Sequence, residues 1–533
     1  MNLRRRDILK LLPWLVAEEG FAQTAKLRGA SQARGIASAA RTYAYFVDPA
    51  NGNDLNTGLS PAAAFKTLGK LVSASVPTTD AVALAFGSNW FPCYPWSNLV
   101  FAWECARALA NSGKTVTDLV AGGGNNDMTL GKDAGGTNAP TWSSATGLTF
   151  NGTNSLCTFN GTNSLCKSLT SPALANFSLY LVYSSTTQPA NSPRLITQQG
   201  GGIFWFQDTI NTGGINGSPE TRWTYGNVAA QVSKSLYHDG NFHVLTITYD
   251  GTTFYHYEDG AQLWWATASG GSSTPSGLYI GAADASGDQT LPASLDSCYL
   301  YSAAHSQSTV QQVVTAIQAR LRMQGQAGIS FPEILAFEGD SLTDGYNVNP
   351  PSTLVYGTAS GFSPALPAGS GVYNLGWRSQ KIADLRAWMP QRVTPLLAFT
   401  TGKKILHVWG GTNDLSVGSP NLTNIENAIA GYCSDAKAAG WTKVVIATLI
   451  DRTPTGNANS NIRANLATVN AWIRANYTNW AAGLDDLGAI SGMNPTSTND
   501  YAGSYYQSDG IHLNASGVAA AVPTAIAALQ PLI

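Results

Sequence analysis

Charge is what this sequence has least of. Only 12% of its 533 residues are charged and the formal net charge is −2, whereas ordinary globular proteins carry about twice that share of charged residues. A chain without a basic excess has no electrostatic basis for binding nucleic acid or an anionic membrane surface. No stretch holds 18 consecutive apolar residues, so we expect no transmembrane helix.

Cysteine is also scarce, and the patterns of a metal site are missing. None of the six cysteines has zinc-ligand spacing or forms a Cys-x-x-Cys pair, so we predict no metal and no cofactor. Five precede residue 300, and we expect at least one disulfide among them if the protein is exported. The sixth follows Ile425 and Ile429 at helical spacing and is predicted to be buried. The six are Cys93, Cys105, Cys157, Cys166, Cys298 and Cys433.

What the sequence does have is length, with 54 glycines and many turn residues. The length exceeds one ordinary domain, so we predict a multidomain protein. Changes of pattern divide it into four segments. These are an export signal and linker at 1–43, a short opening segment at 44–97, an all-β jelly-roll sandwich at 98–325, and an α/β three-layer domain with a parallel sheet at 332–533.

The first segment bears on export. Residues 5–10, Arg-Arg-Asp-Ile-Leu-Lys, resemble a twin-arginine export signal, followed by a short apolar core at 11–17 and small residues for cleavage at 22–25. Glu18 and Glu19 interrupt this region early. We expect a secreted or periplasmic protein; the alternative is a basic N-terminus without a targeting role.

The second segment is short and rich in turns. Residues 45–54, 57–61 and 65–68 resemble the opening segment of right-handed parallel β-helix proteins, including polysaccharide lyases and phage tailspikes. No regularly spaced strands follow it. We therefore interpret this segment as a remnant or a cap without a catalytic role.

The third segment reads as strands joined by tight turns. Residues 243–249 alternate and are rich in β-branched side chains, Asp250-Gly251 forms a turn, and residues 253–257 return before a second turn at Asp259-Gly260. Many strands with almost no helix favour a sandwich. Together with residues 148–152 and 278–281, this hairpin region resembles the concanavalin A-like, laminin-G-type jelly roll.

Two further features lie in this segment. Residues 150–157 recur as 159–166, so a loop or hairpin must separate the two copies. Four tryptophans are candidates for stacking on sugars, and their alternative role is in the core: Trp205, Trp223, Trp264 and Trp265. A helix with an apolar stripe is predicted at 308–322 and closes the segment.

The fourth segment alternates strands with helices. Compact apolar runs at 334–337, 405–409 and 444–450 are typical of buried parallel strands. Helical stripes lie between them, and Gly440 is predicted to end one helix. Such alternation implies a three-layer, flavodoxin-like α/β sandwich, in which a site forms beyond the carboxyl ends of the strands.

Four short blocks in this segment carry the chemistry. They supply a serine, a glycine amide, an asparagine side chain and an Asp/His pair, which are the parts of an acyl-transfer site. Only two histidines lie in the segment, and His407 sits within an apolar run that favours a core position. The four blocks are Gly339-Asp340-Ser341-Leu342-Thr343, Asn374-Leu375-Gly376, Gly411-Thr412-Asn413-Asp414 and Asp509-Gly510-Ile511-His512.

In this order the blocks resemble those of the SGNH, or GDSL-type, hydrolase and esterase family. The resemblance implies Ser341 as nucleophile, His512 as base and Asp509 as the acid that orients it. It assigns the oxyanion hole to the backbone N–H of Ser341, the backbone N–H of Gly376 and the side-chain amide of Asn413. Asp414 is predicted to support its loop.

One stretch departs from the family pattern. The family usually has small residues after the glycine, whereas here Trp377 and Arg378 follow Gly376. These two side chains either bind substrate at the pocket or cover the sheet from outside. Residues 347–370, rich in Pro, Gly and Ser, are predicted to form a loop at the rim of the site.

The sequence therefore predicts an exported serine esterase, a carboxylic ester hydrolase, that removes acyl groups from a polysaccharide or oligosaccharide. Acetyl is the expected acyl group. One alternative is a lipase, arylesterase or thioesterase acting on small or lipid esters. The other is a non-catalytic, glycan-binding surface or phage-type protein.

Overall fold

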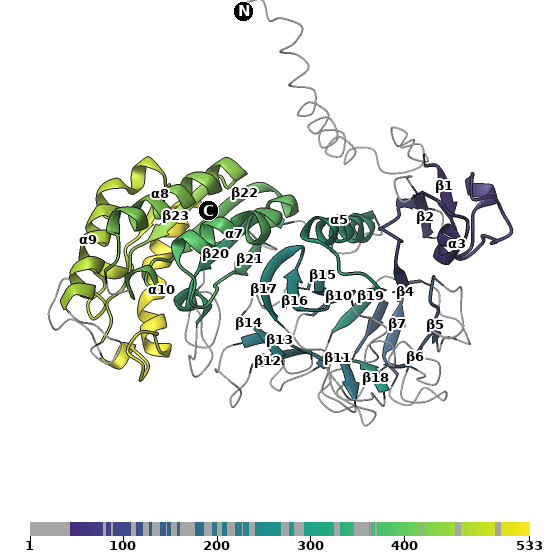
Figure 1. The fold of residues 1–533 in the computed structure, drawn as a ribbon, viewed down its shortest axis with the longest axis horizontal. Coiled ribbons are helices and arrows are strands. Elements are labelled where there is room, and N and C mark those ends of the chain that lie inside the picture. Colours follow the sequence, from purple (N-terminus) through teal and green to yellow (C-terminus); the bar gives the residue numbers. More distant parts are fainter. Residues whose placement is uncertain are drawn as a thin grey trace, which may run out of the picture. The chain divides into compact units, whose positions relative to one another are not determined.

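The structure is a computed structural model, drawn in Figure 1. It describes residues 43–533 with interruptions, so the predicted export signal lies outside the described residues. The residues it does not describe are 1–42, 78–81, 87–88, 108–112, 114, 121–126, 131–138, 145–146, 151–156, 160–175, 186–193, 200–204, 211–218, 226–227, 234–239, 268–276, 282–292, 324–330, 346–361, 363, 368–369, 417–418, 454–459 and 496–502.

The opening segment forms a small sheet of its own. Its strands β1 (Tyr45–Val47), β2 (Val82–Phe86) and β3 (Asn89–Pro92) lie in the order β1-β2-β3. A short 3-10 helix η2 (Pro61–Ala63) and helix α3 (Leu68–Ser73) connect the first two strands. Asp54 fixes this connection, because its carboxylate accepts hydrogen bonds from the backbone N–H groups of Lys66 and Thr67 at 2.8 and 2.9 Å.

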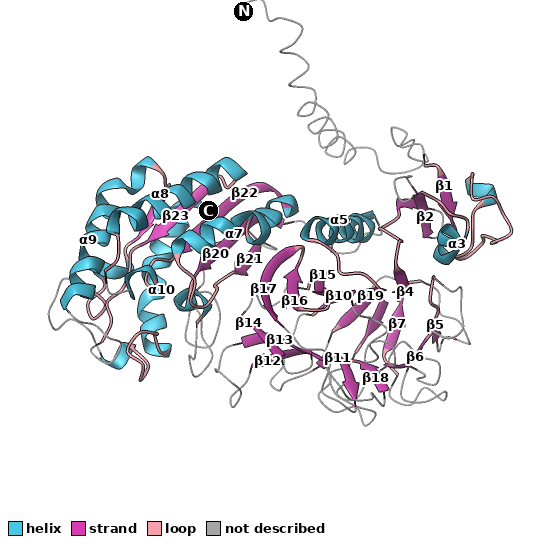
Figure 2. Ribbon diagram, in the orientation of Figure 1, coloured by secondary structure: helices cyan, strands magenta, loops and turns pink. Residues whose placement is uncertain are grey.

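The next region consists of two antiparallel sheets, which confirms the predicted β-sandwich (Figure 2). The first sheet has the order β17-β16-β15-β10-β19-β8-β7, with β4 also paired to β19. Its strands are β4 (Leu99–Glu104), β7 (Thr141–Ser143), β8 (Gly147–Thr149), β10 (Phe177–Ser184), β15 (His243–Tyr249), β16 (Thr253–Glu258), β17 (Ala261–Thr267) and β19 (Ser294–Tyr301).

The second sheet has the order β14-β13-β12-β11-β18-β9-β6-β5. Its strands are β5 (Thr115–Val116), β6 (Met128–Leu130), β9 (Cys157–Phe159), β11 (Arg194–Gln199), β12 (Trp205–Ile210), β13 (Pro219–Tyr225), β14 (Val228–Ser233) and β18 (Gly277–Ile280). The side chains of Trp205 and Trp223 and most of the duplicated stretch lie outside what the structure describes.

The predicted hairpins are present in the first sheet. Strands β15 and β16 pair in antiparallel register, and β17 follows after a turn in which Asp259 and Gly260 both have positive φ angles, 51° and 81°. Helix α5 (Gln307–Met323) covers the predicted helical stretch, and the apolar stripe from Val310 to Leu321 is buried. The described cysteines Cys93, Cys105, Cys298 and Cys433 form no disulfide. The side chains of Cys157 and Cys166 lie outside what the structure describes, so a disulfide between these two stays a prediction. Cys433 is buried, as predicted.

The C-terminal region contains a sheet of five parallel strands in the order β21-β20-β22-β23-β24. In chain order this is 2-1-3-4-5, the flavodoxin-like arrangement, whose ligands bind where strands 1 and 3 lie side by side. The prediction of the fold class is therefore confirmed. The strands are β20 (Phe331–Gly339), β21 (Gly371–Asn374), β22 (Thr400–Trp409), β23 (Lys443–Ala447) and β24 (Gly483–Asp485).

Helices cover both faces of this sheet, because successive strand residues point to opposite sides. Ile334, Leu406 and Val444 belong to one apolar cluster, together with residues of α7 (Ile382–Arg392), α8 (Leu422–Ala439) and α9 (Ser460–Asn476). Leu335, Ile405 and Val445 belong to another cluster, together with α10 (Ala515–Leu529). Gly440 ends α8 at a φ of 119°, as predicted.

Residues Ala515–Leu532, which include α10, are long and apolar enough to span a membrane by composition. Five residues on one side of α10 are nevertheless buried in the cluster that contains Leu335, Ile405 and Val445: Val518, Ala521, Val522, Ala525 and Leu529. Core helices of globular proteins are similarly apolar, so the position of α10 in the core of this fold explains its composition.

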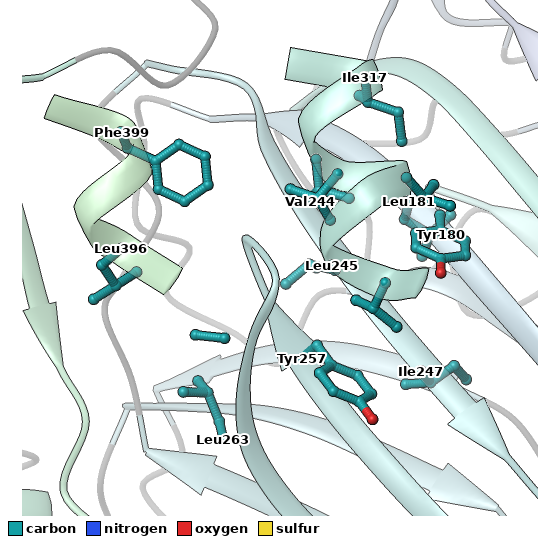
Figure 3. Close-up of a cluster of buried hydrophobic side chains, with 14 of the residues drawn as sticks. Tyr180, Leu181, Val244, Leu245, Ile247, Tyr257, Leu263, Ile317, Leu396 and Phe399 are labelled. Atoms are coloured by element: carbon teal, nitrogen blue, oxygen red, sulfur yellow. The ribbon is translucent and has the colours of Figure 1, made fainter. Parts of the chain in front are cut away.

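One apolar cluster runs through both the sandwich and the α/β region (Figure 3). It contains Val244 and Leu263 from the sandwich, Ile317 from α5, and Leu396 and Phe399 from the 3-10 helix η4 (Thr394–Phe399). All five side chains are buried. The two regions therefore share a continuous hydrophobic core.

Candidate active site

Ser341 lies on a sharp turn directly after β20. Strand β20 ends at Gly339, and the short helix α6 (Ser341–Asp344) begins at once, with Asp340 as its N-cap. The Asp340 carboxylate accepts the backbone N–H of Leu342 at 3.0 Å. A Cβ at position 339 would lie 2.1 Å from Thr343 Oγ1 and 2.2 Å from the Trp409 carbonyl oxygen, so only glycine allows the strand to pass this closely to β22.

His512 brings Ser341 and Asp509 together. Its Nε2 lies 2.8 Å from Ser341 Oγ, and its Nδ1 lies 2.7 Å from Asp509 Oδ2. The other oxygen of Asp509 accepts the backbone N–H groups of Ile511 and His512 at 2.9 and 3.0 Å, which folds this short turn back onto the imidazole. Three predicted site residues from two distant blocks thus meet in one hydrogen-bonded chain.

The electrostatics of Asp509 suit an orienting acid. Burial raises the pKa of Asp509, but hydrogen bonds from the His512 side chain and from the two backbone N–H groups outweigh it, and its pKa lies below the ordinary value. An ionised carboxylate only accepts hydrogen bonds. His512 Nδ1 therefore carries the ring proton, and the lone pair of Nε2 faces the Ser341 hydroxyl.

Asn413 lies on the loop after β22, the strand that pairs with β20. Its side-chain Nδ2 donates to the Gln380 carbonyl oxygen at 3.0 Å, which fixes the direction of the amide. The second hydrogen on the same nitrogen makes no hydrogen bond to the described residues. Neighbouring Asp414 accepts the backbone N–H of Ile382 at 3.0 Å at the start of α7, so it supports its loop as predicted.

Gly376 packs against the turn that carries Ser341. A Cβ at this position would lie 2.3 Å from the backbone nitrogen of Asp344. The close neighbour of this glycine is therefore the chain itself. The Gly376 N–H donates to Asn374 Oδ1 at 2.9 Å, while Asn374 Nδ2 donates to the Thr343 carbonyl oxygen at 2.9 Å.

Asn374 was therefore missed as a functional residue by the sequence reasoning, although it belongs to one of the four blocks. Its amide joins the loop after β21 to the turn after β20. The signal was its position two residues before the glycine, where an Asn side chain commonly accepts a backbone N–H.

In the structure, Trp377 and Arg378 both contact other residues of this protein. Trp377 lies 4.4 Å, between ring centroids, from Trp265 of β17 and 6.2 Å from Trp388 of α7. Arg378 forms an ion pair with Asp344. Of the two remaining tryptophan candidates with described side chains, Trp265 thus lies at this contact, and Trp264 packs near Phe254 with ring centroids 6.4 Å apart.

Two buried carboxyl groups, Glu338 on β20 and Asp340 directly after it, have raised pKa values. Burial raises the pKa of Asp340 to about 7, against the opposing effects of the Leu342 N–H and Arg452. Burial also raises the pKa of Glu338 to about 7, against its attraction to Arg392. In the described residues, one oxygen of each carboxyl group has no hydrogen-bond partner.

These pKa values predict how stability depends on pH. Between about pH 4 and pH 7 the folded protein binds more protons at these carboxyls than the unfolded chain, so the free energy of unfolding falls as pH rises through this window. We expect Asp340→Asn to reduce the difference in Tm between pH 5 and pH 8. Each kcal/mol by which the substitution reduces the pH dependence of the free energy of unfolding corresponds to about 2–4 °C of that difference. Asp435→Asn, at a half-exposed ion pair with Arg386, is the control. Equal pH dependence of Tm in the wild type, Asp340→Asn and Asp435→Asn would contradict the raised pKa of Asp340.

Two family models match parts of this chain. Residues 337–520 match the model of the GDSL-like Lipase/Acylhydrolase family, so the chain contains an ester hydrolase domain. More particularly, this domain is a GDSL-type acylhydrolase domain. It is preceded by residues 151–311, which match the Concanavalin A-like lectin/glucanases superfamily. Both predicted resemblances are confirmed, in the predicted order.

Comparisons with curated proteins and solved structures add little to these family matches. No curated protein matches the chain. A Trypanosoma rangeli sialidase in complex with sialic acid is 16% identical with a TM-score of 0.33, covering 47% of this chain and 38% of that one. The structure of TesA is 17% identical with a TM-score of 0.27, covering 38% of this chain and 99% of that one. The chain thus spans little more than a third of the sialidase length, and TM-scores this low do not establish a shared fold.

Proposed function

We propose that this protein is an exported serine esterase that removes acetyl groups from a carbohydrate, using Ser341, His512 and Asp509. The observation that carries the proposal is the hydrogen-bonded chain from Ser341 through His512 to Asp509, at 2.8 and 2.7 Å. A serine hydroxyl is a weak nucleophile without an adjacent base, and this chain supplies the base and orients it.

The reaction follows from the positions of these atoms. Ser341 Oγ attacks the ester carbonyl carbon while its proton passes to His512 Nε2. The tetrahedral intermediate collapses as His512 returns this proton to the leaving alcohol, which leaves an acyl group on Ser341. A water molecule then attacks the acyl-enzyme in the same way, and acetate and the free serine are released.

The oxyanion of the intermediate needs fixed donors. We assign this role to the backbone N–H of Ser341, the second hydrogen of Asn413 Nδ2 and the backbone N–H of Gly376. The first two make no hydrogen bond among the described residues, while the Gly376 N–H is held by Asn374 Oδ1. An oxyanion is a stronger acceptor than a neutral amide oxygen, so the Gly376 N–H is expected to bind it as the charge develops.

The class of substrate is supported by the domain that precedes the hydrolase. Residues 151–311 match a superfamily of lectins and glucanases, and a domain that holds a polymer raises the effective concentration of esters near Ser341. The motif at residues 5–10 supports export. These features favour an acylated polysaccharide or oligosaccharide over a soluble small ester.

Acetate release from acetylated xylan tests the proposal, with p-nitrophenyl acetate as a small-ester control. We expect the wild-type protein to release acetate from both. Hydrolysis of the small ester alone would leave the serine mechanism standing and contradict the carbohydrate assignment. Release of long-chain fatty acids in preference to acetate would identify a lipase, and no hydrolysis of any ester would favour a glycan-binding protein.

A further inference from the structure

Gly376 lies in a loop whose two flanking residues are fixed by hydrogen bonds to β20. The backbone N–H of Leu375 donates to the Phe337 carbonyl oxygen at 2.7 Å, and that of Trp377 donates to the Gly339 carbonyl oxygen at 2.8 Å. These bonds hold one edge of the loop. The Leu375 carbonyl oxygen and the Trp377 ring are held by other groups.

Arg392, at the end of α7, contacts both of those groups. Its guanidinium donates to the Leu375 carbonyl oxygen and lies 4.7 Å from the centroid of the Trp377 ring. The side chain is 1% exposed and faces Glu338 of β20, with Nε 3.3 Å from the carboxylate. A buried arginine needs several acceptors because each unpaired donor is costly.

The remaining acceptors come from the sandwich. Arg392 Nη1 donates to the Leu263 carbonyl oxygen of β17 at 2.7 Å and lies 3.5 Å from that of Gln262. Trp265, on the same strand, lies 4.4 Å from Trp377 and 4.4 Å from Trp388, measured between ring centroids. Strand β17 therefore contacts the two groups that border Gly376, one through Arg392 and the other directly.

We infer that β17 of the sandwich and Arg392 position the loop that carries the Gly376 N–H, one of the proposed oxyanion donors. The sandwich thus contributes to catalysis and not to polymer binding alone. The inference rests on the proposed serine esterase mechanism. Arg392 and Trp265 touch no reacting atom, so they are positioning residues. A shift of the loop by about 1 Å is enough to weaken catalysis by up to about 100-fold, while the binding of a small ester depends less on it.

Adjacent tryptophans on β17 provide a matched test. Trp265 packs on Trp377, whereas Trp264 points to the other face of the strand and packs near Phe254. We expect Trp265→Ala to lower kcat for p-nitrophenyl acetate by about 10- to 100-fold with KM changed less than about twofold. Trp264→Ala should keep kcat within about twofold of the wild type, and thermal unfolding of both variants shows whether they remain folded.

A second pair of variants covers the case in which Trp265→Ala fails to fold. Arg392→Lys keeps a charge opposite Glu338 but lacks the fork that reaches both Leu263 and Leu375. Arg386→Lys, on the same helix and in a half-exposed ion pair with Asp435, is its control. We expect a fall in kcat with unchanged KM only for Arg392→Lys. Equal kcat in the two lysine variants, or a rise in KM alone, would overturn the inference.

A second readout separates this inference from the proposed function. If the wild-type protein hydrolyses no ester, the proposed function fails. The rate at which a fluorophosphonate phosphonylates Ser341 still reports on the same loop, because its phosphoryl oxygen needs the same donors. Slower labelling of Trp265→Ala than of Trp264→Ala would support the positioning role, and equal rates would contradict it.

Discussion

Replacing Ser341 with alanine is expected to lower kcat/KM for p-nitrophenyl acetate by about 10⁴-fold or more. The variant keeps the turn after β20, because alanine is smaller than serine and fits in its place. It lacks the oxygen that attacks the ester. Hydrolysis by the wild-type and variant proteins at equal concentration gives the ratio directly. Removing one member of such a group costs nearly as much as removing all of them, so a large effect is expected from this change alone.

Two controls make this result specific. Ser434→Ala removes a hydroxyl that donates to the Ala430 carbonyl oxygen on the exposed face of α8, and it should leave the rate unchanged. The Tm of Ser341→Ala should stay close to that of the wild type, since the lost hydrogen bond to His512 is partly open to solvent. Full activity in Ser341→Ala would exclude this serine as the nucleophile.

The second large effect is expected for Asn413→Ala, a fall in kcat of about 100- to 1,000-fold with KM nearly unchanged. Loss of one donor that binds the oxyanion mainly in the transition state lowers kcat without weakening substrate binding. Asn413→Asp should be slower still, because a carboxylate cannot donate and repels the developing negative charge. Steady-state kinetics on p-nitrophenyl acetate distinguishes kcat from KM.

Asn413 also holds its loop through the Gln380 carbonyl oxygen at 3.0 Å, so the variant requires a structural control. Asn476→Ala removes an amide that donates to the Trp472 carbonyl oxygen at the end of α9. It matches the chemical change at a position outside the proposed site. Similar losses of activity in both variants, or a rise in KM alone for Asn413→Ala, would contradict the donor assignment.

Much of the fold could be predicted because its signals are local. Compact apolar runs predicted β20, β22 and β23, and the last of these ends at Ala447 instead of continuing to Ile450. The alternation of strands and helices predicted that a site would form beyond the carboxyl ends of the strands, since parallel strands bring these ends to one edge of the sheet. The bond between His512 and Ser341 spans 171 residues, and it was predicted through the resemblance to a family together with the expected core position of His407.

What could not be predicted depends on contacts between distant segments. Nothing local to Arg392 indicates that its acceptors lie on β17, 129 and 130 residues earlier. Trp377 was left between two roles for the same reason, because the side chain that covers it, Trp265, belongs to another region. The pKa values of Asp340 and Glu338 likewise follow from burial, which a sequence pattern does not quantify.

Because of the continuous apolar cluster of Figure 3, the sandwich and the α/β region are not readily exchanged separately between proteins. Modules joined by a flexible linker can be recombined freely, because each keeps its own core when its neighbour is replaced. Here Leu396 and Phe399 of η4 share a core with Val244 and Leu263 of the sandwich. A recombination that brought in a foreign sandwich would expose this apolar surface, so the two regions are expected to be inherited together.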